Sequence, residues 1–165
     1  MEPNMKKHII SALVTNRPGV LTRVAGLFSA RGFNIDSLAV GETEQHDVSR
    51  MTIVVTGDDN TIEQVRKQLE KLIDVVKVTD YGGTEYVERD LALIRVHAPI
   101  SKRNEILELV NIFRAKVVDI GRADIMIELP GAEAKVEAFL DLLRPYGIRE
   151  VVRTGRIAMT RSSRE

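Results

Sequence analysis

The residues best suited to bind a ligand form a short loop, residues 16–19, which reads Asn-Arg-Pro-Gly and precedes a helical pattern. Backbone N–H groups at the start of a helix lack partners within the helix and carry partial positive charge, so they bind anions. Gly19 lets a ligand approach closely, and Pro18 is expected at the first helical position, where a missing donor is tolerated. The spacing predicts either an anion-binding helix start or an ordinary strand-to-helix turn.

Asn34 is a second candidate ligand, flanked by Phe33 and Ile35 in an expected strand. The oxygen of a side-chain amide accepts hydrogen bonds from an ammonium group. If Asn34 and the loop met across a subunit boundary, they would hold the ammonium and the carboxylate of a small zwitterion. Its residue type alone is equally compatible with a solvent-facing strand residue.

Residue patterns for catalysis or metal binding are weak in this sequence. The histidines His8, His46 and His97 are widely separated, and no zinc-protease, nucleophile-elbow or phosphate-cradling motif occurs. The chain contains no cysteine, which excludes disulfides, thiolate nucleophiles and cysteine-ligated metals. Arg50 is expected to be an ordinary sheet-face residue. We therefore predict no catalytic residue and no metal ligand, so the chain is not expected to be an enzyme.

The composition predicts a globular protein without a strong electrostatic field. Hydrophobic residues make up 44% of the 165 residues and charged residues 29%, and 24 Lys and Arg balance 24 Asp and Glu. A net charge of zero provides no general attraction to nucleic acid or anionic lipid. The apolar runs are far shorter than the ~20 residues of a membrane span, and the first residues lack a signal-peptide core. We expect a soluble cytoplasmic protein that has no membrane association.

Hydrophobic periodicity predicts a strand-helix-strand-strand-helix-strand order in the first half of the chain. A β-bulge is expected near Asp36, a helix end at Gly32, and a capping box with Asn60 as N-cap and Glu63 three residues later. The expected strands cover residues 8–14, 33–40, 49–56 and 75–79, and the expected helices cover residues 19–31 and 60–72. This is the βαββαβ order of ferredoxin-like domains.

The same order returns after the glycine pair at residues 82–83. Strands are expected over residues 91–96, 117–120, 125–129 and 148–152, with helices over residues 101–115 and from Gly131 onward. We therefore predict an α+β protein of two ferredoxin-like βαββαβ domains, residues 1–80 and 88–165, joined by a linker over residues 81–87. The arginine-rich tail from Arg149 is expected to be solvated or to contact an acidic partner. Helices would cover one face of each antiparallel sheet, and a dimer or partner is the simplest cover for the other.

The βαββαβ order is also that of the RNA recognition module, which stacks bases on aromatic residues of its two central strands. The corresponding strands here, residues 8–14 and 49–56, contain no Phe, Tyr or Trp. We therefore expect no nucleic-acid partner.

Several blocks of the sequence resemble a known family, the small regulatory subunit of acetolactate synthase (acetohydroxyacid synthase). The strongest are N-R-P-G-V-L-T-R-V-A-G-L-F, R-G-F-N-I-D-S-L and S-R-M-T-I, at residues 16–28, 31–38 and 49–53. The likeness continues at residues 68–75, 87–91, 112–115 and 153–155. The resemblance implies that residues 1–80 form an ACT domain, an amino-acid-sensing βαββαβ module.

The resemblance further implies a regulatory subunit without an active site of its own. Such a subunit binds and activates the catalytic large subunit and confers valine feedback inhibition in branched-chain amino acid biosynthesis, the route to valine, leucine and isoleucine. The cofactors thiamine diphosphate, Mg²⁺ and FAD would belong to the catalytic subunit, with none in this chain.

In the family, valine binds where the ACT domains of a homodimer meet. Carried over by motif, Asn16 and Gly19 of one protomer would face Asn34 of its partner, with Val20 and Leu21 as further contacts. The second half has no comparable ligand motif, so no site is assigned there. Two alternatives remain open from the residues themselves: an ACT repressor or sensor of another biosynthetic enzyme, and a small ferredoxin-like enzyme.

Overall fold

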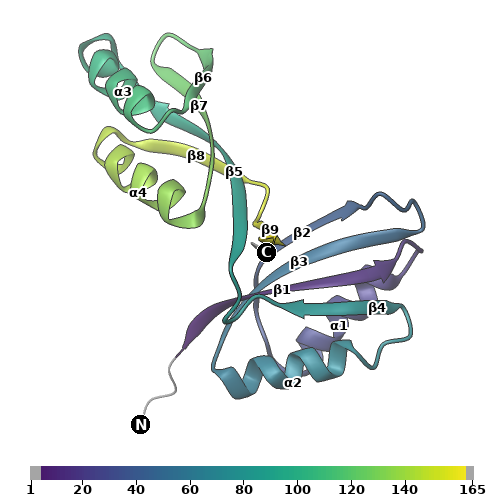
Figure 1. Ribbon diagram of the computed structural model, residues 1–165. Coiled ribbons are helices and arrows are strands. Elements are labelled where there is room, and N and C mark those ends of the chain that lie inside the picture. The colour runs from purple at the N-terminus through teal and green to yellow at the C-terminus, as the bar shows by residue number, and fades with distance from the viewer. Residues whose placement is uncertain (1–4, 163–165) are drawn as a thin grey trace. The chain divides into compact units, whose positions relative to one another are not determined.

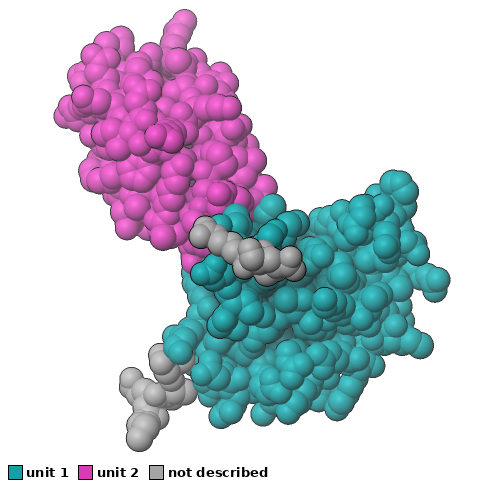
Figure 2. Space-filling view, viewed as in Figure 1, with its two compact units in different colours: residues 1–87, 156–165 teal, residues 88–155 magenta. Residues whose placement is uncertain are grey.

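The computed structural model describes residues 5–162, which divide into two compact units (Figure 1). The first comprises the residues up to Val87 together with those from Arg156 onward, and the second comprises Glu88–Gly155 (Figure 2). This division differs from the predicted one, because residues 81–87 and the C-terminal segment both belong to the first unit. Residues 1–4, on which the expected absence of a signal peptide rests, and residues 163–165 lie outside the described residues.

The first unit has the predicted βαββαβ order. Its strands form an antiparallel sheet in the order β2-β3-β1-β4, and α1 and α2 lie on one face of this sheet (Figure 1). The elements are β1 Lys6–Thr15, α1 Val20–Ala30, β2 Ile35–Glu42, β3 Val48–Gly57, α2 Asp59–Leu69 and β4 Val75–Asp80. The predicted bulge is confirmed, because the register of β2 against β3 shifts between Ile35 and Ser37.

The core of this unit lies between the sheet and its two helices. Alternate residues of β1 and β3 point to the same side, so their apolar side chains meet those of the helices. These buried side chains are Ile10, Ala12, Val14, Met51, Ile53 and Val55 from the strands, and Val20, Val24, Phe28, Ile62, Val65 and Leu69 from the helices. This packing fixes both ends of α1 relative to the sheet.

The C-terminal segment of the chain covers part of the opposite face of the sheet. Ala158, in the short strand β9 (Ile157–Thr160), is 7% exposed and packs in one buried cluster with Ile9, Val54 and Tyr81. The Tyr81 hydroxyl donates a 2.9 Å hydrogen bond to the Ala158 carbonyl. The sequence led us to expect a solvated tail and a partner over this face, but a strand of the same chain lies there.

Two predicted helix starts differ in the structure. Gly19, with φ +86°, is the N-cap of α1, so Pro18 precedes the cap and is not the first helical residue. The N-cap of α2 is Asp58, whose carboxylate accepts a 2.7 Å hydrogen bond from the Thr61 N–H, and not Asn60. Asp and Asn are both favoured at this position, so residue preference alone does not separate them. The Gly32 prediction is confirmed, because Gly32 follows the C-cap of α1 with φ +71°.

The second unit repeats the same architecture. Its sheet has the order β6-β7-β5-β8, and its helices α3 and α4 share one buried core with the strands. Helix α4 begins at Glu133 and not at Gly131, because Gly131 still pairs with Asp90 at the end of β7. The elements are β5 Tyr86–His97, α3 Ile100–Ile112, β6 Lys116–Ile120, β7 Asp124–Gly131, α4 Glu133–Leu143, a 3₁₀ turn Arg144–Tyr146 and β8 Ile148–Arg153.

The predicted fold class, α+β with two ferredoxin-like units, is therefore confirmed. Within residues 5–162, every helix is too short or too polar to cross a membrane.

Candidate functional site

The loop of residues 16–19 connects β1 to α1 and is held by backbone hydrogen bonds. The Asn16 N–H donates to the Asp47 carbonyl at 2.7 Å, and the Arg17 N–H donates to the Thr15 carbonyl at 3.0 Å. The first of these bonds ties the loop to the connection between β2 and β3. The backbone at the start of α1 is therefore placed by the sheet beneath it.

The side chain of Asn16 binds the same connection. Its Nδ2 donates to Glu42 Oε1 at 3.2 Å and to the His46 carbonyl at 3.1 Å. Glu42 Oε2 in turn lies 3.6 Å from Nδ1 of His46. The two donor bonds fix the orientation of the Asn16 amide, so this residue holds the loop in place as well as presenting an acceptor oxygen.

The start of α1 has the features of an anion site. Gly19 provides no capping side chain, and the first turn of α1 contains no acidic residue. A Cβ built on Gly19 would meet no atom within 4 Å, so the position is open. The N–H groups of the exposed residues Leu21 and Thr22, in the first turn of α1, are therefore available to a ligand carboxylate, whose charge the helix dipole favours.

Val20 and Leu21 differ in what they can offer a ligand. Val20 is 2% exposed and belongs to the core, and its N–H donates a 3.4 Å hydrogen bond to the Arg17 carbonyl. Leu21 is 45% exposed, so its apolar side chain is free to contact a ligand or a second protomer. Of the two further contacts that the resemblance implies, Leu21 is therefore exposed and Val20 is buried.

Asn34 lies in the turn between α1 and β2 and is exposed. Its Nδ2 donates a 2.8 Å hydrogen bond to Oδ1 of Asp36, whose Oδ2 accepts a 2.6 Å bond from the Thr56 hydroxyl on β3. Because the amide nitrogen is held in this way, the amide oxygen remains as the acceptor for an ammonium group. The bulge of β2 thus orients Asn34.

The two halves of the motif lie at opposite ends of α1. The loop precedes Val20 and Asn34 follows Ala30, and an eleven-residue helix is about 16 Å long. An amino acid joins its carboxylate and its ammonium through one carbon atom. Within one chain, the structure therefore does not bring Gly19 and Asn34 together on one such ligand.

Three further charged or titratable residues that the sequence singled out, Arg50, His97 and His8, lie near polar neighbours. Arg50 Nη1 donates to the Ser11 hydroxyl at 2.9 Å on the sheet face, and His97 Nδ1 lies 3.5 Å from Asp124 Oδ1. His8 Nε2 lies 3.9 Å from Asp59 Oδ1. Among the described residues, no three His, Asp or Glu side chains are grouped so as to hold a metal ion.

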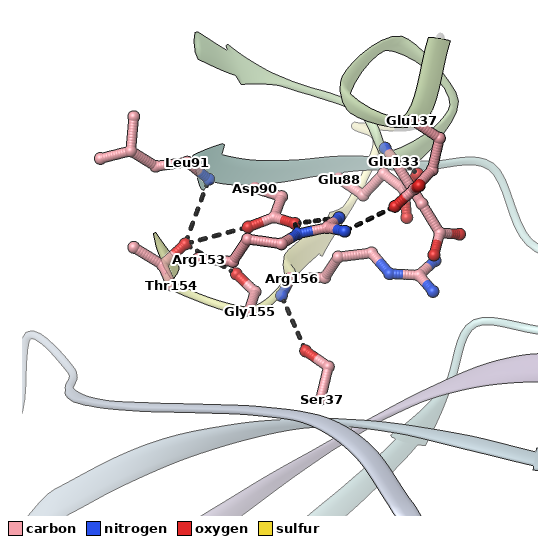
Figure 3. A network of polar contacts seen from close by, with 10 residues as sticks. All are labelled: Ser37, Glu88, Asp90, Leu91, Glu133, Glu137, Arg153, Thr154, Gly155 and Arg156. Atoms are coloured by element: carbon pink, nitrogen blue, oxygen red, sulfur yellow. Dashed lines mark hydrogen bonds and ion pairs between the residues drawn. The ribbon is translucent and has the colours of Figure 1, made fainter. Parts of the chain in front are cut away.

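A charged cluster around Asp90 was not predicted from the sequence (Figure 3). Asp90 is 3% exposed, and its carboxylate accepts from Arg153 Nε at 2.7 Å and from the Thr154 hydroxyl at 3.2 Å. Arg153 also pairs with Glu137. Burial opposes the charge of Arg153, but the hydrogen bonds to Glu137 and Asp90 raise its pKa above the ordinary value. An aspartate before the apolar run of β5 was the signal available in the sequence.

Two family models match this chain. Residues 10–77 match the model described as the AHAS small subunit-like ACT domain, and residues 89–162 match the model described as the small subunit of acetolactate synthase. The two matches fall on the two halves of the chain, each of which contains one βαββαβ element order.

Individual relatives agree with these models over nearly the full length of the chain. A probable acetolactate synthase small subunit of Archaeoglobus fulgidus is 60% identical, over 96% of this chain and 99% of the relative. The acetolactate synthase small subunit of Mycolicibacterium smegmatis is 52% identical, over 95% of this chain and 92% of the relative. The crystal structure of the small subunit from Thermotoga maritima, 49% identical, superposes with a TM-score of 0.86 over 96% of this chain and 99% of that one. The chain therefore belongs to the family of acetolactate synthase small subunits.

Proposed function

We propose that this chain is a regulatory subunit that forms a homodimer through its first unit, binds free valine at the dimer interface, and makes a catalytic large subunit sensitive to valine. The observation that carries the proposal is that Gly19 and Asn34 lie beyond opposite ends of α1, a helix of eleven residues that is about 16 Å long. A second protomer is therefore needed to bring the helix start at Gly19 and the amide of Asn34 together on one amino acid.

A two-fold symmetric dimer satisfies this requirement directly. If the α1 helices of the two protomers pack antiparallel, the start of one lies beside the end of the other, and the symmetry forms two equivalent sites. Strand β2 is an edge of its sheet and is open to pairing with a second copy. The exposed apolar side chains of Leu21 and Val40 favour burial in such an interface.

The effector would be recognised through both of its charged groups. Its carboxylate would accept hydrogen bonds from the N–H groups at the start of α1, and its ammonium would donate to the Asn34 oxygen of the partner protomer. Leu21 supplies apolar surface for a branched aliphatic side chain. Since both protomers contribute, valine would stabilise one arrangement of the dimer over others, and a bound catalytic subunit would respond to that shift.

In this proposal the chemistry of acetolactate synthesis belongs to the catalytic large subunit, together with thiamine diphosphate, Mg²⁺ and FAD. This chain would contribute binding, activation and feedback inhibition, and we place it in the cytoplasm.

Calorimetric titration of the full chain with valine, leucine and isoleucine, alongside analytical ultracentrifugation, tests the proposal. We expect a dimer that binds valine, and a holoenzyme whose activity falls as valine is added. A stable monomer, or a dimer without affinity for any of the three, would contradict it.

The same preparation separates the alternatives. A sensor of another enzyme would not co-purify with a large thiamine-diphosphate subunit, and a small ferredoxin-like enzyme would convert pyruvate by itself. We expect co-purification, and no turnover of pyruvate by the isolated chain.

A further inference from the structure

The chain passes from the second unit back to the first between Gly155 and Arg156. Residues on both sides of this crossing are held by hydrogen bonds, each within its own unit (Figure 3). On the side of the first unit, the bond reaches the strand that follows Asn34.

In the first unit, the Arg156 N–H donates a 3.1 Å hydrogen bond to the Ser37 hydroxyl. Ser37 stands immediately after the β2 bulge, where it pairs with Val54 of β3. Asp36, the preceding residue, accepts the hydrogen bond that orients Asn34. A continuous set of contacts therefore runs from the proposed ammonium ligand to the crossing.

In the second unit, Thr154 is held to β5 by three hydrogen bonds. Its hydroxyl accepts from the Leu91 N–H at 3.1 Å, and its one proton is shared between buried Asp90 at 3.2 Å and the Gly155 carbonyl at 2.9 Å. Its own N–H donates to the Leu91 carbonyl at 3.1 Å. Arg153 adds its hydrogen bond to the same Asp90 carboxylate. This end of the crossing is thus fixed to the strand that runs through the core of the second unit.

Gly155 alone separates the two anchored residues, and its φ is +85°. Residues other than glycine rarely adopt this conformation. The chain therefore runs through one glycine from a residue anchored in the second unit, Thr154, to a residue anchored in the first, Arg156.

We propose that Ser37 is a positioning residue that couples the effector site to the second unit: its hydrogen bond to Arg156 lets a shift of the β2 bulge on valine binding move residues 153–154. The inference rests on the proposed function, in which Asn34 binds valine. It assigns to Ser37 and Thr154 a role in transmitting the signal and none in binding the effector.

The test is Ser37→Ala in the full chain, reconstituted with the catalytic subunit. We expect unchanged valine affinity of the isolated chain by calorimetry, and a rise of about five- to tenfold in the valine concentration for half-maximal inhibition, the size of a modest coupling energy. Ser37→Thr, which keeps the hydroxyl, should restore inhibition. Ser101→Ala, at an exposed serine of α3, is the matched control and should behave as wild type.

Thr154→Val provides a second variant on the other side of the crossing. It removes the hydroxyl with little change of shape, and we expect the same loss of inhibition with intact valine binding. The rate of amide hydrogen exchange in residues 88–97 gives an independent measurement. Valine should change this rate in the wild type and should leave it unchanged in both variants.

If valine inhibited the holoenzymes containing Ser37→Ala and Thr154→Val as strongly as the wild type, the coupling role would be overturned. It would also be overturned if Ser37→Ala lost valine affinity and valine inhibition in parallel, because that result would place Ser37 in the effector site. A wild-type chain that binds no valine is a different result, because it would overturn the proposed effector site and the coupling with it.

Discussion

Gly19 combines an unusual backbone conformation with an open position at a helix start. Its φ of +86° suits glycine, and a Cβ there would meet no neighbouring atom within 4 Å. A substitution at this residue therefore acts through backbone strain and through whatever group it places at the start of α1, and not through a clash with the core.

Gly19→Asp should weaken valine binding strongly. The new carboxylate would occupy the N–H groups that the effector carboxylate needs and would repel it, so we expect a loss of affinity of at least about tenfold. Calorimetry measures this directly. Gly83→Asp is the matched control, because Gly83 has φ +76° and equally open surroundings, and it should keep the affinity of the wild type. Equal affinity in Gly19→Asp would remove the effector from this loop.

The sequence identifies candidate residues for the site but not their contacts. Asn16, Gly19 and Asn34 are identifiable because they lie in two short blocks, residues 16–28 and 31–38, that resemble the family. The burial of Val20 depends on how α1 packs on the sheet, and the bonds of Asn16 to Glu42 and His46 depend on a loop about 30 residues away. Such contacts are set by tertiary structure, so local patterns do not reveal them.

At the scale of elements, the start of α2 depends on one charged cap. The hydrogen bond donated by Thr61 to the Asp58 carboxylate lowers the pKa of Asp58 below its ordinary value. A carboxyl group whose pKa falls on folding stabilises the protein above its unfolded pKa of about 3.9, and this contribution is lost as the pH falls through the lowered value.

We therefore expect Asp58→Ala to have a lower midpoint of thermal unfolding than the wild type at pH 7. The difference should narrow below about pH 4, where the wild type loses the charge of its cap. Asp58→Asn keeps a capping acceptor without the charge, so its midpoint at pH 7 should lie between those of Asp58→Ala and the wild type. Circular dichroism melts across this pH range measure both effects, and a difference independent of pH would contradict the role of the charge.

Strand β9 is the element that the sequence did not predict. It has only four residues, and it pairs with β5, about 70 residues earlier in the chain. Regular periodicity needs longer segments than this, so the other strands and the helices were predictable, with errors confined to their ends. Pairing over such a separation is decided by the tertiary fold.

Ala158→Asp tests the contribution of β9 to the first unit. The new carboxylate would be buried among Ile9, Val54 and Tyr81, and we expect a loss of about 2–4 kcal/mol in the free energy of unfolding. Met159→Asp, at a neighbouring position that is 72% exposed, should change it by less than about 0.5 kcal/mol. Denaturant titration compares the two variants, and equal stability would show that β9 does not cover the sheet in solution.

At the scale of the whole molecule, the central claim concerns two copies of the chain. In the proposed dimer, each protomer would carry the carboxylate-binding and the ammonium-binding halves of the site at opposite ends of one helix, and the two-fold symmetry would join them twice. Under this account, a defect in either half would affect only the sites to which that half contributes.

The most direct measurement is complementation between Gly19→Asp and Asn34→Ala. Each variant alone should form dimers with strongly reduced valine affinity. Co-expressed with different affinity tags and purified on both, they give a heterodimer in which one site carries both defects and the other carries neither.

Calorimetry of this heterodimer should recover wild-type affinity at about half the stoichiometry of the wild-type dimer. A heterodimer that binds valine no better than the two parent variants would contradict the shared site, and with it the proposed mechanism.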